Sequence, residues 1–229
     1  MESPRFPGLT GNQLKLIALI TMTIDHIGMM LFPGVRVLRV IGRMAFPIFA
    51  YMIAEGCQYT RNRKKYLLSM VSLAAIYQVV YFFAMGSLYM SVLVTFSLSI
   101  GLIYLLDQFD PQERGSQLGF FLGLCGVFFL TRVLPDLIPR TDYGIDYGLW
   151  GILLPVLVHF GKDRKEKLRN FAVGQVLLAL GSGPLQWFSL ATVPLMALYN
   201  GKRGKRKMKY LFYIYYPAHL VVIYLLSLL

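Results

Sequence analysis

The feature that most constrains this chain is a series of apolar blocks, most of them about as long as a helix that crosses a bilayer. A transmembrane helix needs roughly 20 predominantly apolar residues. Hydrophobic residues make up 56% of the 229-residue chain and charged residues only 15%, which leaves too little polar surface for a water-soluble domain of this size. The sequence therefore predicts an all-α, polytopic membrane protein whose first partner is the lipid bilayer.

Nine blocks are separated by glycines, prolines and short charged runs, and they predict a single integral membrane domain over residues 1–229. No internal repeat, low-complexity linker or cleavable signal peptide is evident. The stretch GSGPLQW fits either a tight turn or a re-entrant break, so the count around 168–199 stays open. The predicted spans are 13–31, 36–56, 66–85, 89–106, 116–138, 145–161, 168–182, 186–199 and 210–229.

The basic residues fall unevenly on the two sides of these spans. Of the 23 Lys and Arg residues, most lie in TRNRKKY, GKDRKEKLRN and NGKRGKRKMK, which share one side if nine spans alternate. The positive-inside rule places that side in the cytoplasm, so we expect the N-terminus inside and the C-terminus outside, in a cell inner or plasma membrane. The net charge of +12 then faces anionic headgroups, and no nucleic acid partner is expected.

Five arginines on the expected outer side run against this rule: Arg36, Arg39, Arg43, Arg132 and Arg140. Arg36, Arg39 and Arg43 recur at spacings that place them on one helical face, and Tyr51 and Glu55 continue that stripe inward. Ionisable groups in a span are costly unless they are paired or line a polar cavity, so structural ion pairs and a functional cavity both fit the stripe. The available acidic partners are Asp25, Asp136, Asp142 and Asp146.

The stretch ITMTIDHIGMMLF, residues 20–32, places Asp25 and His26 side by side in an apolar span. An imidazole accepts and returns a proton near neutral pH, and intramembrane ionisable groups are functional candidates. Adjacent helical residues point about 100° apart, so the two side chains do not bond simply by being neighbours. We expect Asp25 to pair with an arginine of the next span and to leave His26 in the cavity.

The other histidines and the cysteines give weaker signals. His159 lies near the inner end of its span, and His219 shares a helical face with Tyr216, where a packed and a catalytic role are equally open. No two histidines have a metal-ligand spacing, so no metal site is predicted. Cys57 and Cys125 offer no disulfide framework.

These residues belong to a wider pattern that resembles the TraX family. The segments LKLIALITMTIDHIGMML, RVIGRMAFPIFAYMIAEGCQYTRNRKKYLLSM, DYGLWGILLPVLV and YLFYIYYPAHLVVIYLL match it in order and spacing through nearly the whole chain. The resemblance implies a membrane N-acetyltransferase, because the founding members acetylate the N-terminus of conjugative pilin. It leaves the acceptor open: a peptide, glycan, lipid or small molecule.

A weaker likeness extends to the wider membrane acyltransferases that modify sugars, where an intramembrane histidine follows the start of the first helix. LKLIALITMTIDH, FPIFAYMIAEG and YYPAHL are similar to their first, second and last helices. By this resemblance His26 is the candidate general base. Lys15 stands where those proteins have Arg-Gly, and Glu55 with Gly56 where they have Ser-Gly, so the donor site is expected to be built differently.

The resemblance implies acetyl-CoA as acyl donor and an unknown acyl acceptor. Acetyl transfer needs a base for the acceptor and a donor for the developing oxyanion, and basic cytoplasmic loops can attract the phosphates of coenzyme A. The expected catalytic residues are His26, Asp25 and Arg43. The expected substrate-binding residues are Arg36, Arg39, Tyr51, Glu55, Tyr216 and His219. The candidates for coenzyme A binding are Arg61, Arg63, Lys64 and Lys65.

Two other classes stay open. A small-molecule transporter would explain a polar cavity, although no inverted repeat is found and nine spans do not divide into equal halves; counterflow would reveal it. A non-catalytic membrane assembly protein would explain the charged pairs, and its function would survive replacement of His26 by alanine.

Overall fold

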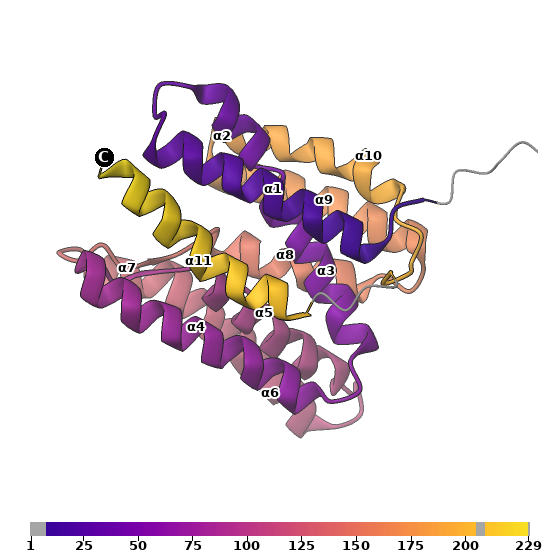
Figure 1. Ribbon diagram of the computed structural model, residues 1–229. Helices are drawn as coiled ribbons and strands as arrows, with labels where there is room; N and C mark the ends of the chain where they lie inside the picture. The colour runs from indigo at the N-terminus through magenta and orange to yellow at the C-terminus, as the bar shows by residue number, and fades with distance from the viewer. Residues whose placement is uncertain (1–7, 205–208, 229) are drawn as a thin grey trace, which may run out of the picture. The chain divides into compact units, whose positions relative to one another are not determined.

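The computed structural model describes residues 8–204 and 209–228, and over these residues the chain is almost entirely helical (Figure 1). The predicted all-α fold class is confirmed. Contacts divide the chain into two compact units: unit one contains Met1–Met52 and Ser182–Leu229, and unit two contains Ile53–Gly181. The two boundaries each fall inside a helix, and the assignment of the whole chain to a single domain stays a prediction.

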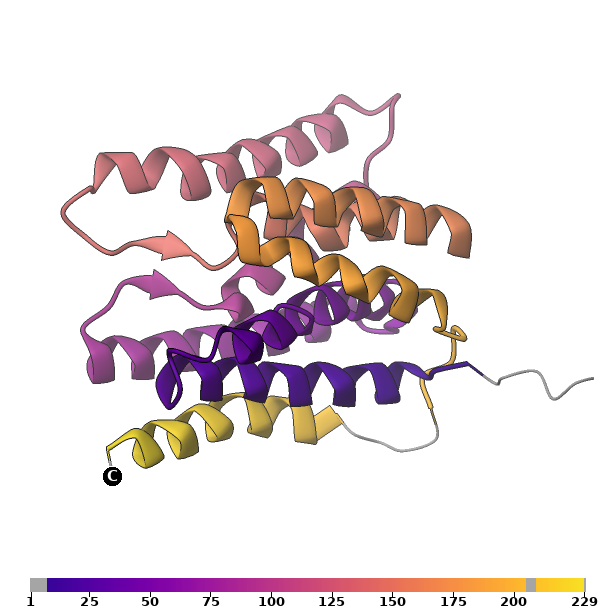
Figure 2. The same cartoon turned by 90° about the horizontal axis from the view of Figure 1, so that it is seen from above.

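Unit one is built around the first helix, which begins at a well-formed cap. Thr10 accepts a hydrogen bond from the backbone N–H of Gln13, whose side chain bonds the backbone of Thr10 in return, and this arrangement satisfies donors that the first turn leaves open. Helix α1 packs against α2 and α11, and Figure 2 shows α1 and α11 side by side. The elements of unit one are α1 (Gly11–Met30), α2 (Arg36–Gly42), the first half of α3 (Ala45–Tyr59), the 3₁₀ segment η2 (Pro184–Ala191), α10 (Thr192–Ala197) and α11 (Lys209–Ser227).

Unit two contains longer helices and a short parallel strand pair that the sequence did not predict. Strand β1 (Tyr89–Met90) pairs with β2 (Gly144–Ile145) and joins two interhelical connections. Buried hydroxyls also connect neighbours: Ser99 of α5 donates 2.8 Å to the carbonyl of Ile152 of α8. The helices of unit two are the end of α3, α4 (Arg63–Met85), α5 (Val92–Asp107), α6 (Arg114–Phe128), the π-helical segment η1 (Phe129–Val133), α7 (Leu134–Leu137), α8 (Gly148–Phe160) and most of α9 (Arg164–Ser182).

Each of the nine predicted spans coincides with a helical segment of the described residues, although three are not continuous α-helices. The second breaks at Arg43 and Met44, the fifth contains η1, and the eighth begins as η2. Within the described part of the chain, three stretches are both long and apolar enough to cross a membrane: Arg36–Tyr59, Arg63–Met85 and Arg114–Leu137. Membrane association is therefore supported, while nine crossings and their orientation stay predictions.

Polar contacts connect the ends of the helices in unit two. Asp107, at the end of α5, contacts both Arg63 at the start of α4 and His159 at the end of α8, each at 2.7 Å. At the opposite ends, the backbone N–H of Leu88 donates 2.8 Å to Asp142. Hydrogen bonds from Ser87 and Leu88 lower the pKa of the exposed Asp142 carboxyl, so this connection is expected to hold across neutral pH.

Cysteine labelling tests the expected orientation. In a variant with Cys57→Ser and Cys125→Ser, we expect Lys64→Cys and Lys202→Cys to react with a membrane-impermeable maleimide only after cells are permeabilised, because the positive-inside rule places these loops in the cytoplasm. Thr141→Cys should react in intact cells. Labelling of Lys202→Cys from outside would overturn the orientation. Residues 205–208 of the same basic loop lie outside the described residues.

Candidate functional site

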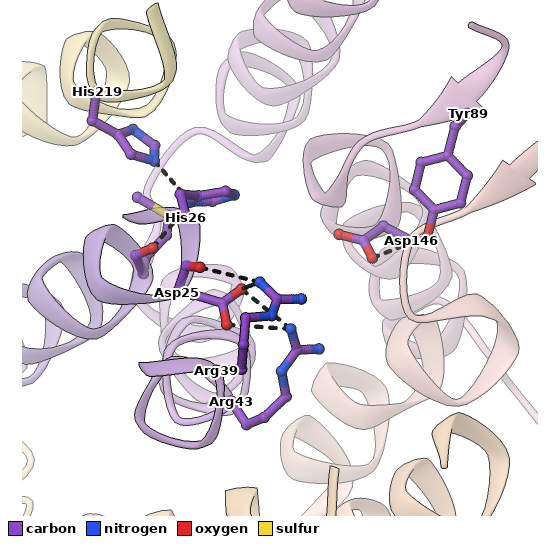
Figure 3. Close-up of polar contacts among 8 residues, drawn as sticks. Asp25, His26, Arg39, Arg43, Tyr89, Asp146 and His219 are labelled. Carbon is purple, nitrogen blue, oxygen red and sulfur yellow. Dashed lines mark hydrogen bonds and ion pairs between the residues drawn. The ribbon is translucent and has the colours of Figure 1, made fainter. Parts of the chain in front are cut away.

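The predicted pairing of Asp25 with arginines of the next span is confirmed. Asp25 Oδ2 lies 2.7 Å from Arg39 Nη1, and both of its carboxylate oxygens lie 3.2 Å from Arg43 Nη2 (Figure 3). Arg39 Nη1 also donates to the backbone carbonyl of Asp25 at 3.1 Å. All three side chains are mostly buried, with exposed fractions of 14–24%. Two guanidinium groups thus share one carboxylate, which leaves this Asp25–Arg39–Arg43 cluster with a formal charge of +1.

Two glycines allow α1 and α2 to approach closely enough for this cluster. A Cβ atom at Gly28 would lie 2.6 Å from Cβ of Leu38, and a Cβ atom at Gly42 would overlap the side chain of Asp25, including its own Cβ. Real Cβ contacts are longer than this, because packed protein interiors leave no room for such overlap. The small residues at these positions therefore permit the pairing, and the turn at Arg43 and Met44 lets Arg43 reach back to Asp25.

Gly42→Ala should displace Asp25 without changing any charged group. Overpacking a well-packed site typically costs about 1–3 kcal/mol, and the shift would weaken the hydrogen bonds of Asp25 to Arg39 and Arg43. We expect a lower melting temperature of the purified protein and a loss of its function. Gly34→Ala is the matched control, because a Cβ atom there meets nothing within 4 Å. Equal melting temperatures for the two variants would contradict this account of the packing.

His26 lies beside the cluster but bonds elsewhere. Its Nδ1 is 3.0 Å from the backbone carbonyl of Met22, one turn earlier, and 3.1 Å from Nε2 of His219. A carbonyl oxygen only accepts, so this contact assigns the ring proton to Nδ1. In the neutral ring Nε2 then carries the lone pair, and among the described residues it makes no hydrogen bond. The arrangement leaves a basic nitrogen on the half-buried side chain of His26, beside Arg39 and Arg43 (Figure 3).

The structure brings together two histidines that are 193 positions apart in the sequence. The two ring centroids are 5.0 Å apart. His219 is 6% exposed, its ring stacks on Tyr215 at 5.3 Å, and Tyr216 meets it edge-on at 5.8 Å. Tyr215 and Tyr216 also pack on a small apolar cluster of α1 and α3: Leu19, Met22 and Ala45.

The other expected substrate-binding residues are Arg36 and Tyr51 of unit one and Glu55 of unit two. Arg36 is exposed at the start of α2. Tyr51 is buried two turns beyond Arg43, with its ring edge-on to Tyr199 at 6.1 Å. Glu55 lies in unit two. The sequence prediction depended on a continuous stripe along one helix, and the helical break at Arg43 and Met44 ends that stripe.

The ion pair of Glu55 joins two segments that are far apart in the sequence. Glu55 Oε1 lies 2.5 Å from Nζ of Lys167, and the same ammonium donates to the side-chain oxygen of Gln58. Lys167 belongs to GKDRKEKLRN, one of the basic segments expected on the cytoplasmic side, yet it is 8% exposed and lies on α9. A buried carboxylate needs a partner, and this partner is 112 positions away.

The candidates for coenzyme A binding lie at the start of α4, where all four side chains are exposed. One of them, Arg63, is already paired with Asp107 and lies 5.3 Å above the ring of Tyr104. Its charge is therefore partly neutralised, which leaves the neighbouring cations as the stronger candidates: Arg61, Lys64 and Lys65. The described residues contain no group of three or more His, Cys, Asp or Glu side chains that could hold a metal ion.

A comparison with protein families shows the family to which the chain is related. A family model described as "TraX protein" matches residues 10–227. The chain belongs to the TraX family. This TraX protein is similar to "Probable fimbrial assembly protein FimC, serogroup H1" of Dichelobacter nodosus, with 26% identity over 252 residues that cover 92% of this chain and 93% of that protein. The resemblance in the sequence motifs is thus confirmed.

A second relative of this TraX protein is "Uncharacterized protein RP591" of Rickettsia prowazekii (strain Madrid E). The two are 29% identical over 157 residues, which cover 68% of this chain and 57% of the relative. No solved structure matches the chain.

Proposed function

We propose that this TraX protein is a multi-pass membrane acyltransferase that moves acetyl from cytoplasmic acetyl-CoA to an amine or hydroxyl of an envelope or membrane-embedded acceptor. The observation that carries the proposal is the state of His26. Its Nδ1 is held in hydrogen bonds, which leaves Nε2 as the basic nitrogen of a half-buried side chain beside the Asp25–Arg39–Arg43 cluster. A positioned base of this kind is what acyl transfer from a thioester requires.

In the proposed step, the nitrogen of the acceptor amine attacks the acetyl carbonyl carbon, and His26 Nε2 takes a proton from that amine. A C–N bond forms, the C–S bond breaks, and the proton passes from the imidazolium to the leaving thiolate, which departs as free coenzyme A. Negative charge develops on the carbonyl oxygen during the attack, and a guanidinium such as that of Arg43 can stabilise it. Asp25 orients Arg43 and Arg39 for this role rather than contacting the substrate.

The charge of the cluster also bears on the acceptor. Two guanidinium groups lie beside one carboxylate, and Arg36 is exposed at the start of α2, so the site offers cationic groups that can bind an acceptor with an anionic group. Guanidinium groups bind carboxylates and phosphates with paired hydrogen bonds. On the cytoplasmic side, Arg61, Lys64 and Lys65 supply the attraction for coenzyme A phosphates.

Binding of the donor is the first experimental test. We expect calorimetric titration of the purified protein in lipid nanodiscs to detect binding of both acetyl-CoA and coenzyme A. A variant with Lys64→Gln and Lys65→Gln should bind both more weakly, because two of the proposed phosphate contacts are lost. The double variant with exposed apolar residues replaced, Ile76→Ala and Val80→Ala, should bind as the unchanged protein does. No binding of either compound in detergent or nanodiscs would argue strongly against the acyltransferase proposal.

A second candidate function is supported by the name of the Dichelobacter relative, which describes fimbrial assembly. A non-catalytic assembly protein would use the charged cluster to hold its own helices together, without a chemical role for His26. The two candidates differ in one outcome. If fimbriae or other envelope structures form normally in cells that carry a folded His26→Ala variant, the assembly role is favoured over catalysis.

A further inference from the structure

Both ring nitrogens of His219 are occupied within unit one. Its Nδ1 lies 2.9 Å from the backbone carbonyl of Tyr215, which only accepts, so Nδ1 carries the proton. In the neutral ring Nε2 then has the lone pair, and this nitrogen lies 3.1 Å from Nδ1 of His26. His219 therefore has no nitrogen left to bind a substrate or to act as an independent base, so any effect it has on the reaction passes through His26.

The proton positions of the two rings are complementary. The Nδ1–H of His26 lies between two acceptors, the carbonyl of Met22 at 3.0 Å and Nε2 of His219 at 3.1 Å (Figure 3). A histidine ring with its proton held on one nitrogen has its lone pair fixed on the other. The two hydrogen bonds thus run in one direction: His26 donates to His219, and His219 donates to the carbonyl of Tyr215.

We propose that His219 is a positioning residue that accepts the Nδ1–H of His26 and thereby keeps the basic Nε2 directed at the acyl acceptor. Its catalytic consequence rests on the proposed function. When His26 takes up the acceptor proton, its Nδ1–H becomes a charged donor, and hydrogen bonds from charged donors are shorter and stronger than neutral ones. His219 stabilises this imidazolium without taking a proton itself.

The surroundings of His219 restrict its ring to this orientation. The ring is buried and nearly parallel to that of Tyr215, with an interplanar angle of 8°. Tyr215 also bonds α1 directly, since its hydroxyl lies 2.7 Å from Oγ1 of Thr23. Among the described residues, two side-chain hydrogen bonds one turn apart therefore connect α1 and α11, and the one at His219 involves the proposed base. This difference supplies a matched control.

A spectroscopic measurement tests the hydrogen bond without any assay of activity. The chain has 3 histidines, so the full-length protein labelled with ¹⁵N-histidine gives few ring signals. We expect His26 and His219 to be protonated on Nδ1, with a scalar coupling between Nδ1 of His26 and Nε2 of His219. His159 should show the opposite tautomer, because its Nε2 lies 2.7 Å from Asp107. A proton on Nε2 of His26, or no coupling, would overturn the inference.

Substitution separates positioning from packing. The assay follows radiolabelled acetyl from acetyl-CoA into an envelope extract of cells that lack the protein. We expect His219→Leu to lower the turnover number by about 10- to 100-fold, as loss of a supporting hydrogen-bond partner commonly does, with unchanged affinity for coenzyme A. His219→Gln should recover most of the turnover, because its side-chain oxygen can accept from Nδ1 of His26.

Tyr215→Phe is the control, since it removes the bond to Thr23 and leaves the two histidines in place. It should retain turnover near that of the unchanged protein. Equal losses in His219→Leu and His219→Gln, or a similar loss in Tyr215→Phe, would show a purely structural role. Full transfer by His26→Ala would instead refute the proposed function. The coupling between the two rings is measured in the unchanged protein, so the hydrogen bond would still be tested separately.

Discussion

His26→Ala is expected to leave a folded protein that binds acetyl-CoA but no longer transfers acetyl. The substitution removes the proposed general base and leaves the Asp25–Arg39–Arg43 cluster intact, because His26 bonds only Met22 and His219 among the described residues. Loss of a general base typically lowers the rate by roughly 10²–10⁴-fold. The measurements are acetyl transfer to envelope components, the melting curve and calorimetric binding of acetyl-CoA, all with the same preparation.

Met29→Ala is the matched control for this variant. Met29 lies on α1 one turn after His26, and it is 48% exposed, so truncation there should alter neither transfer nor folding. Unchanged turnover in a well-folded His26→Ala variant would mean that the histidine is structural and that the base lies elsewhere. A loss of acetyl-CoA binding together with transfer would assign His26 to the donor site instead.

Asp25→Asn is expected to have the largest effect on stability. It leaves the guanidinium groups of Arg39 and Arg43 without the carboxylate that both contact, in a mostly buried site. Removing one partner of a buried ion pair costs about 3–5 kcal/mol, and here one carboxylate serves two cations. The melting temperature should fall clearly, and transfer should fall as well because Arg43 loses its orientation.

Asp136→Asn gives the comparison, since it removes the same charge at an exposed position of α7. Its melting temperature should stay close to that of the unchanged protein. A double variant with Asp25→Asn and Arg39→Met should recover part of the lost stability, because it removes one of the two unneutralised cations. Equal melting temperatures for Asp25→Asn and Asp136→Asn would show that the cluster contributes no stability.

Local patterns in the sequence predicted the helices and one of the long-range pairings. The apolar blocks gave the order of the helical segments, because burial in lipid or protein demands a long apolar run. The pairing of Asp25 with Arg39 and Arg43 was also predictable, since an unpaired charge in an apolar span is costly and those arginines are the nearest cations on the expected side.

Contacts between distant segments were not predictable from one sequence. The approach of His219 to His26 depends on how α11 packs against α1, and no local pattern encodes that packing. Lys167 was missed for a different reason: it stands among solvent-like basic residues, and only the buried Glu55 on another helix shows why it is itself buried. The available signal was a carboxylate in an apolar span.

The buried Lys167 also has a consequence for how this protein enters a membrane. Helix α9 begins with a run of charged residues and buries a lysine and Gln175, and such a segment partitions poorly into lipid when it leaves the translocon alone. Its stable placement depends on Glu55, which the ribosome makes more than a hundred residues earlier. Unit two is therefore expected to assemble cotranslationally from its N-terminal helices, with α9 held at the insertion machinery until α3 can receive it.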